Sequence, residues 1–204
     1  MPSLTLYTNP MSRGRIVRWM IEEVGEPYEV VNLEYGTTMK AAEYLAVNPM
    51  GKVPAIKHGD TVVTEVAAIC AYLADAFPDA GLAPPPADRG SYYRWMFFTA
   101  GPLEAAVTNK AFGFAAPDKK QSLGYGSYEE ALDAVETAII PGPYVCGDRF
   151  NAADVVLGSQ LSFGMMFGTI PKRPAFETYV ARLLTRPAAV RANALDDAAM
   201  PKRD

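Results

Sequence analysis

The chain has 204 residues, of which 50% are hydrophobic and 21% are charged, and its formal net charge is −4. This length and apolar content suit one large or two small domains with buried cores. The sequence pI is about 5.1 and no run of Lys or Arg occurs. These features argue against nucleic acid and anionic membranes as partners.

Several further classes are excluded by what the sequence lacks. No apolar stretch approaches the roughly 18 residues of a membrane span, so we expect no membrane partner. The N-terminus has neither the basic flank nor the apolar core of a signal peptide, which predicts a cytoplasmic protein. Cys70 and Cys146 suit a reducing compartment and form no CxxC pattern, and His58 is the only histidine. We therefore expect no metal site and no histidine-based catalytic triad.

The first part of the chain alternates between strand and helix patterns. Leu4–Tyr7 alternates like a half-buried strand, and from Ser12 the apolar residues recur at helical spacing until Gly25, a typical helix stop. A second strand is expected at 28–33, a short helix at 41–45, a hairpin over about 55–63, and a helix from about Glu65 to Phe77, with Cys70 in the core. The pattern predicts a small sheet with helices.

Pro54 stands at the first position of an apolar run, after Lys52 and Val53. A proline is tolerated there because its missing N–H removes no hydrogen bond from the ladder. One interpretation is a plain turn before a strand. The other is a cis peptide bond that leaves the N–H and C=O of Val53 as an edge on which an extended peptide can pair.

Two predicted helix starts favour negative charge. Ser12 opens the first helix, and Glu65 with Val66 opens the helix after the hairpin, where free N–H groups and the helix dipole attract anions. Lys52 lies between them in sequence. Each has a plainer interpretation: Ser12 as a helix cap, Glu65 as a complement to the dipole, and Lys52 as a solvated surface residue.

The second part is predicted to be helical. Residues 78–87 are rich in proline and predict a linker, so we expect domains at 1–77 and 88–204. Pro102 is expected to kink a helix over 88–107, and another helix starts near either 118 or Ser127 and ends near 140. Asn151 and Asp154 form a capping-box pattern for a buried helix at 152–167, whose last residues Met165–Phe167 are expected in the core. A last helix is expected over 175–184, ending before Pro187.

Four motifs in this order resemble the cytosolic glutathione transferase family, and in particular its bacterial, serine-type members. They are Ser12 after the first strand, the stretch Asn48–Ile56, Glu65 at the head of its helix, and Gly147–Asp154. The resemblance covers essentially the whole chain. It implies an α/β plus all-α fold, with a thioredoxin-like N-terminal domain followed by an all-helical C-terminal domain. It also implies glutathione as co-substrate and a homodimer.

The resemblance assigns roles residue by residue. It places the cysteinyl backbone of glutathione on Val53, before Pro54, and the γ-glutamyl end near Glu65. It places the glycyl carboxylate near Lys52, with a contribution from Lys40. The family's usual serine after the glutamate is Val66 here, which removes one hydroxyl contact while the backbone N–H remains.

Three residues are candidates for activating the thiol. Ser12 matches the serine-type position, and Tyr7 and Asn9 are alternative donors. The thiolate is the nucleophile, so a donor has only to stabilise the anion and need not attack the substrate itself. Met11 and Trp95 are expected in the acceptor site.

Three functions remain open on this site. The first is conjugation of glutathione to small hydrophobic electrophiles, which implies detoxification. The second is a glutathione-dependent peroxidase or isomerase. The third is a non-catalytic binding module, which Val66 favours. A glutaredoxin-like disulfide reductase is disfavoured because the loop after the first strand contains no cysteine.

Overall fold

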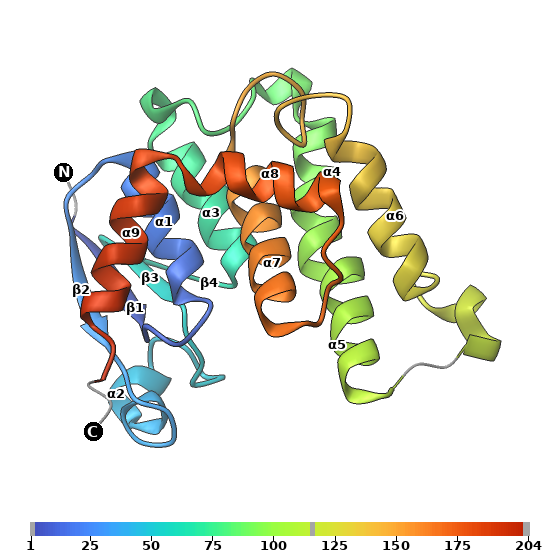
Figure 1. Ribbon diagram of the computed structural model, residues 1–204. Helices are drawn as coiled ribbons and strands as arrows, with labels where there is room; N and C mark the ends of the chain where they lie inside the picture. The colour runs from blue at the N-terminus through green and yellow to red at the C-terminus, as the bar shows by residue number, and fades with distance from the viewer. Residues whose placement is uncertain (1–2, 115–116, 202–204) are drawn as a thin grey trace. The chain divides into compact units, whose positions relative to one another are not determined.

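The computed structural model describes residues 3–114 and 117–201 (Figure 1). Their internal contacts define two compact units. One runs to Leu82 and also includes the segment from Thr185 onward, and the other spans Ala83–Leu184. The expected division into 1–77, 78–87 and 88–204 stays a prediction, but the contacts place the last helix with the first unit.

The first unit is built on one mixed sheet in the strand order β2-β1-β3-β4. Its strands are β1 (Leu4–Thr8), β2 (Tyr28–Asn32), β3 (Ala55–His58) and β4 (Thr61–Thr64). β1 runs parallel to β2 and antiparallel to β3, and β3 and β4 form the expected hairpin. Leu4, Leu6 and Ile56 are at most 2% exposed, so the alternating pattern of β1 marks its buried face correctly.

The helices of the first unit are α1 (Gly14–Val24), α2 (Ala42–Leu45), α3 (Val66–Ala76) and α9 (Pro187–Ala198), with 3-10 turns η1 (Thr38–Lys40) and η2 (Pro78–Ala80). α1 packs on β1 and α3, and α9 packs on α1 (Figure 1). α1 ends as expected, with Gly25 at φ 82° and its N–H bonded to the Ile21 carbonyl. Cys70 is fully buried in α3, also as expected.

The second unit is helical. Its elements are η3 (Pro86–Asp88), α4 (Gly90–Phe98), the π-helical segment η4 (Thr99–Leu103), α5 (Glu104–Phe112), η5 (Pro117–Ser122), α6 (Tyr128–Ile139), α7 (Ala152–Phe167) and α8 (Pro174–Leu184). Pro102 lies in η4, where its missing N–H interrupts the α-helical ladder. The predicted fold class, an α/β sheet unit of thioredoxin-like type plus a helical unit, is confirmed.

Capping chemistry determines where two helices of this unit begin. Ser127 and Glu130 form a capping box, so α6 starts at Tyr128 rather than near residue 118. At α7, the Asn151 side chain accepts the N–H of Ala153, and the Asp154 side chain accepts the N–H of Asn151.

Two helix predictions need correction. The end of α7 is not core, because Met166 and Phe167 are 63% and 74% exposed. Pro187 does not end the helical part of the chain. It takes the first position of α9, where its missing N–H has no helical partner to lose.

Candidate active site

The strand registers bring the three expected parts of the site to one end of the sheet. These parts are the loop containing Ser12, the Val53-Pro54 segment and Glu65. Ala55, the first residue of β3, pairs with Tyr7 of β1 on one side and with Thr64 of β4 on the other. Pro54 therefore enters beside the point where β1 leaves for the loop containing Ser12. It also lies beside the point where β4 leaves for Glu65, because directly opposed residues of antiparallel strands are about 5 Å apart.

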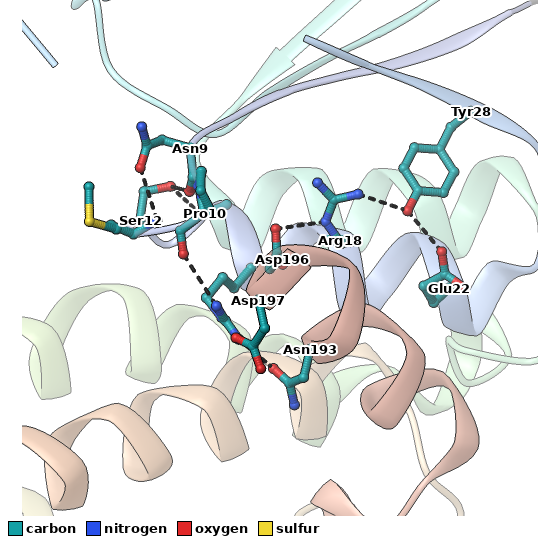
Figure 2. Close-up of polar contacts among 12 residues, drawn as sticks. Asn9, Pro10, Ser12, Arg18, Glu22, Tyr28, Asn193, Asp196 and Asp197 are labelled. Atoms are coloured by element: carbon teal, nitrogen blue, oxygen red, sulfur yellow. Dashed lines mark hydrogen bonds and ion pairs between the residues drawn. The ribbon is translucent and has the colours of Figure 1, made fainter. Parts of the chain in front are cut away.

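The loop after β1 is held by its own side chains (Figure 2). Asn9 is 7% exposed; its Nδ2 donates to the Leu33 carbonyl at 2.7 Å, and its Oδ1 accepts the N–H of Met11 at 2.9 Å. Arg15 Nη1 donates to the Pro10 carbonyl at 3.4 Å. Asn9 thus connects the loop to Leu33, the residue after β2. Its amide nitrogen and its amide oxygen both have hydrogen-bond partners within the protein.

Ser12 also makes two local hydrogen bonds. Its Oγ donates to the Asn9 carbonyl at 2.7 Å and accepts the N–H of Gly14 at 2.9 Å. The hydroxyl satisfies one of the free N–H groups at the start of α1, the cap-like role anticipated for a serine here. The side chain is partly exposed. To donate to a ligand sulfur, its proton must leave the Asn9 carbonyl.

Tyr7, the second candidate donor, belongs to β1 as expected. Its ring lies 5.6 Å from that of Tyr44, centroid to centroid. Tyr7 and Val53 both pack against a small buried cluster whose members are Leu33, Met39, Tyr44 and Ala55. Tyr7 therefore shares its apolar packing partners with Val53.

The Val53-Pro54 peptide bond is cis. Among the described residues, neither the N–H nor the C=O of Val53 has a hydrogen-bond partner. The carbonyl of the preceding residue, Lys52, accepts hydrogen bonds from the Tyr44 hydroxyl and from Asn48 Nδ2. Val53 consequently offers one unpaired donor and one unpaired acceptor, on a backbone that is held just upstream and enters a strand just downstream.

Glu65 has an unusual backbone. Its φ is 69°, and it is the only described residue other than glycine with a positive φ. Such a conformation costs of order 1–3 kcal/mol and tends to occur at functional sites. Glu65 is exposed and stands at the N-cap of α3 without a side-chain capping bond. The N–H groups of the first turn, beginning with Val66, are therefore open to an anion.

Comparison with known proteins gives this arrangement a family. Residues 2–75 match the model of the glutathione S-transferase N-terminal domain. Glutathione S-transferase GstA of Escherichia coli O157:H7 is 35% identical over 159 residues, which are 76% of this chain and 79% of that protein. The chain belongs to the glutathione S-transferase family. The prediction of a glutathione transferase is thereby confirmed at the level of the family.

Solved structures agree over nearly the full length. A glutathione transferase from Methylococcus capsulatus is 30% identical with a TM-score of 0.80, and the match covers 96% of this chain and 99% of that one. A glutathione transferase homologue from Sulfitobacter, solved with bound glutathione, is 29% identical with a TM-score of 0.74 and coverage of 98% and 100%. Both helical and sheet units of this transferase therefore have counterparts.

The two expected lysines differ in their surroundings. Lys40 Nζ donates to the carbonyls of Met50 and Gly51, at 2.9 and 3.0 Å. The exposed ammonium of Lys52 makes no hydrogen bond or ion pair with any described residue. Of the two, Lys52 is the cation left available to a ligand of this transferase.

The residues expected in the acceptor site have contrasting exposure. Met11 is 57% exposed in the loop after β1. Trp95 is 4% exposed in α4, where its ring contacts Phe98 and the Arg94 guanidinium. Their joint role in an acceptor site stays a prediction.

Sequence reasoning missed the residues that hold the loop before Pro54. Tyr44 and Asn48 bind the Lys52 carbonyl, and Asn48 Oδ1 also accepts the N–H of Met50 at 3.0 Å. The available signal was the Asn-Pro-Met-Gly run, since asparagine side chains commonly bond the backbone two residues on. No comparable sequence pattern points to the hydrogen bond of Tyr44.

Metal ligands, membrane spans and free thiols are three further features of the described residues. No group of three or more His, Cys, Asp or Glu residues able to hold a metal occurs among the described residues. No helix in the described part of the chain is long and apolar enough to cross a membrane. Burial raises the pKa of the Cys70 thiol, and burial also raises the pKa of Cys146, which opposes formation of a reactive thiolate at either residue.

Proposed function

We propose that this protein binds glutathione at the Pro54 end of its sheet and activates its thiolate for conjugation to small hydrophobic electrophiles. The observation that carries the proposal is the unpaired N–H and C=O of Val53, next to Pro54. A peptide lying extended along Val53 would satisfy both groups. The Sulfitobacter homologue, which was solved with glutathione, supports the choice of ligand.

The remaining parts of glutathione meet suitable groups in this proposal. The γ-glutamyl carboxylate approaches the free N–H groups of Val66 and the next residues of α3, beside Glu65. The carboxylate of Glu65 accepts hydrogen bonds from the γ-glutamyl ammonium. Lys52 supplies the charge for the glycyl carboxylate. Val66 offers its backbone N–H but no hydroxyl, so this end is held by one hydrogen bond fewer than in relatives with serine.

Ser12 is our candidate for the thiol donor. Once its proton turns from the Asn9 carbonyl to the sulfur, the hydroxyl donates a charge-assisted hydrogen bond to the thiolate at the start of α1. The amide of Asn9 is already paired at both ends, and Tyr7 belongs to the strand, which favours Ser12 over the alternatives. In this role serine stabilises charge and does not attack the electrophile.

The test is the rate of conjugation at saturating glutathione for wild type and Ser12→Ala, with an activated aryl halide as electrophile. Loss of one hydrogen bond to a charged group costs about 1.5–3 kcal/mol, so the thiolate pKa should rise by about one to two units. We expect the conjugation rate near neutral pH to fall by roughly ten- to hundredfold. Unchanged rate and unchanged thiolate absorption would remove Ser12 from this role.

Two alternatives are separated by the same assays. Turnover of organic hydroperoxides without turnover of aryl halides would favour a glutathione-dependent peroxidase, and turnover only of a substrate whose double bond is moved or inverted would favour an isomerase. The non-catalytic alternative is favoured by Val66 and by the committed hydroxyl of Ser12. Calorimetry that detects glutathione binding without any turnover would support it.

We further propose a cytoplasmic homodimer that serves in detoxification. Tyr93 and Phe97 lie one turn apart on α4 and are 44% and 71% exposed, so this helix presents an apolar strip for a second subunit. Sedimentation at micromolar concentration measures the oligomeric state.

A further inference from the structure

Three successive carbonyls before Val53 are held by side chains that precede them in the chain. Lys40, the last residue of η1, donates to Met50 and Gly51. The next carbonyl, that of Lys52, accepts from Tyr44 of α2 and from Asn48. With these three acceptors satisfied, Val53 is the first residue whose carbonyl faces no donor from the described residues.

The fit between Lys40 and this loop is close. Gly51 has a φ of 56°, and a Cβ added there would lie 2.6 Å from the Met39 carbonyl and 2.8 Å from Lys40 Nζ. Only glycine tolerates both the positive φ and the approach of η1. The Lys40 ammonium therefore bonds to the carbonyls of Met50 and Gly51 where η1 lies so close to Gly51 that residue 51 has no room for a side chain.

We propose that Lys40 is a positioning residue, which acts on glutathione through the carbonyls of Met50 and Gly51 and not by binding the glycyl carboxylate. The inference rests on the proposed glutathione site. An ammonium has three N–H donors, and two of those of Lys40 are already used within the loop. Lys52 has no hydrogen-bond or ion-pair partner among residues 3–114 and 117–201, so in this proposal the carboxylate belongs to Lys52.

The test compares glutathione with its glycyl monoethyl ester, which lacks the glycyl carboxylate but keeps the remaining groups. Lys40→Met should raise the KM for both compounds by the same factor, roughly five- to thirtyfold for two lost hydrogen bonds, with kcat changed less than about twofold. Lys52→Met, the matched control, should raise the KM for glutathione and leave that for the ester nearly unchanged. Lys40→Arg should restore most of the loss, because a guanidinium also offers paired donors.

The opposite pattern overturns the proposal. If the effect of Lys40→Met disappears with the ester, Lys40 binds the carboxylate directly. If the KM of Lys40→Arg is as high as that of Lys40→Met, the role of Lys40 does not depend on its hydrogen bonds to the carbonyls.

A second measurement needs no ligand. The amides of Met50 and Gly51 bond to Asn48 within the loop, so their hydrogen exchange reports its order in the free protein. We expect at least threefold faster exchange in Lys40→Met and no change in Lys52→Met. Equal exchange in all three proteins overturns the proposal. A wild-type protein that binds neither compound overturns the proposed function, while exchange still decides whether Lys40 orders the loop.

Discussion

At the scale of single residues, Ser12 in the loop after β1 has a local role that the structure shows and a second role that we propose. The Ser12 hydroxyl accepts the N–H of Gly14 at the start of α1 and donates to the Asn9 carbonyl, so it has partners before any ligand arrives. Exchange of the Asn9 carbonyl for a thiolate replaces a neutral acceptor by a charged one, and charge-assisted hydrogen bonds are about twice as strong. The proposed activation therefore needs only a rotation of one hydroxyl.

Tyr28 supplies a prediction at the same scale. Its hydroxyl donates to Glu22 at 2.8 Å and accepts from Arg18 Nη1 at 3.2 Å (Figure 2). Burial, followed by the hydrogen bond to Glu22, raises the pKa of Tyr28 to about 12. An unfolded tyrosine titrates near pH 10, so the folded protein holds this proton more tightly. The resulting stabilisation is complete below about pH 10 and is lost as the pH rises towards 12.

We expect the free energy of unfolding of wild type to fall between pH 10 and 12 more steeply than that of Tyr28→Phe. Urea unfolding at several pH values measures the difference. Tyr35→Phe, which alters an exposed hydroxyl, serves as the control. Equal slopes for wild type and Tyr28→Phe would show that Tyr28 is not the group responsible.

At the scale of elements, Asp154 joins α7 to its neighbours. It is fully buried, and its Oδ1 accepts the N–H of Val145 and the hydroxyl of Tyr179 of α8, while Oδ2 accepts the N–H of Asn151. Asp154→Ala leaves these donors unpaired, so we expect a loss of about 3 kcal/mol or more in the free energy of unfolding. Tyr179→Phe, which removes one donor together with its bond, should cost about 1–2 kcal/mol. A loss below about 1 kcal/mol for Asp154→Ala would contradict this account.

Charged contacts join α9 to α1. Arg18 Nε donates to Asp196 Oδ1 at 2.8 Å, and both side chains are at most 5% exposed. Arg15 pairs with Asp197 at 2.7 Å near the surface (Figure 2). Two further ion pairs involve α1: Glu23 pairs with Arg186, the N-cap residue of α9, and Glu22 pairs with Arg191 within α9. α9 is thus held along much of its length to the helix that begins at the site.

Removal of one partner from the buried pair should be costly. Asp196→Ala leaves Arg18 as a buried, unpaired cation, and we expect a loss of about 3–5 kcal/mol in the free energy of unfolding. Asp197→Ala, whose carboxylate is 68% exposed, should cost less than about 1 kcal/mol. The double replacement of Arg18 by Met and Asp196 by Leu should recover much of the loss. Equal effects of the two single changes would contradict a special role for the buried pair.

At the scale of the whole molecule, local signals predicted most of the elements. The strand alternation of β1, the glycine that ends α1, and the caps of α6 and α7 each depend on near neighbours, which a sequence displays. The contacts of α9 with Arg15 and Arg18 span 182 and 178 residues of sequence, so the local pattern alone predicts that Pro187 ends a helix rather than begins one. Exposure of Met166 and Phe167 also depends on what surrounds the end of α7.

In the candidate site, too, some features follow from neighbouring residues in the sequence and others depend on residues that meet only in the fold. From the sequence, a cis Val53-Pro54 bond is one of two interpretations, and Glu65 is placed at the head of its helix because it follows the hairpin. Lys40 bonds to the carbonyls of Met50 and Gly51 because η1 lies close to Gly51. No local sequence pattern indicates this close approach. The hydrogen bond from the Ser12 hydroxyl to the Asn9 carbonyl is likewise visible only in the folded loop.

The proposed function requires that glutathione pair with the backbone of Val53. Its most direct test is titration of the ¹⁵N-labelled protein with S-methylglutathione, observed at the Val53 amide. We predict a large shift of this resonance and slower hydrogen exchange, because the free N–H gains an acceptor. Binding that leaves the Val53 amide unchanged, or no binding at millimolar ligand, would contradict the claim.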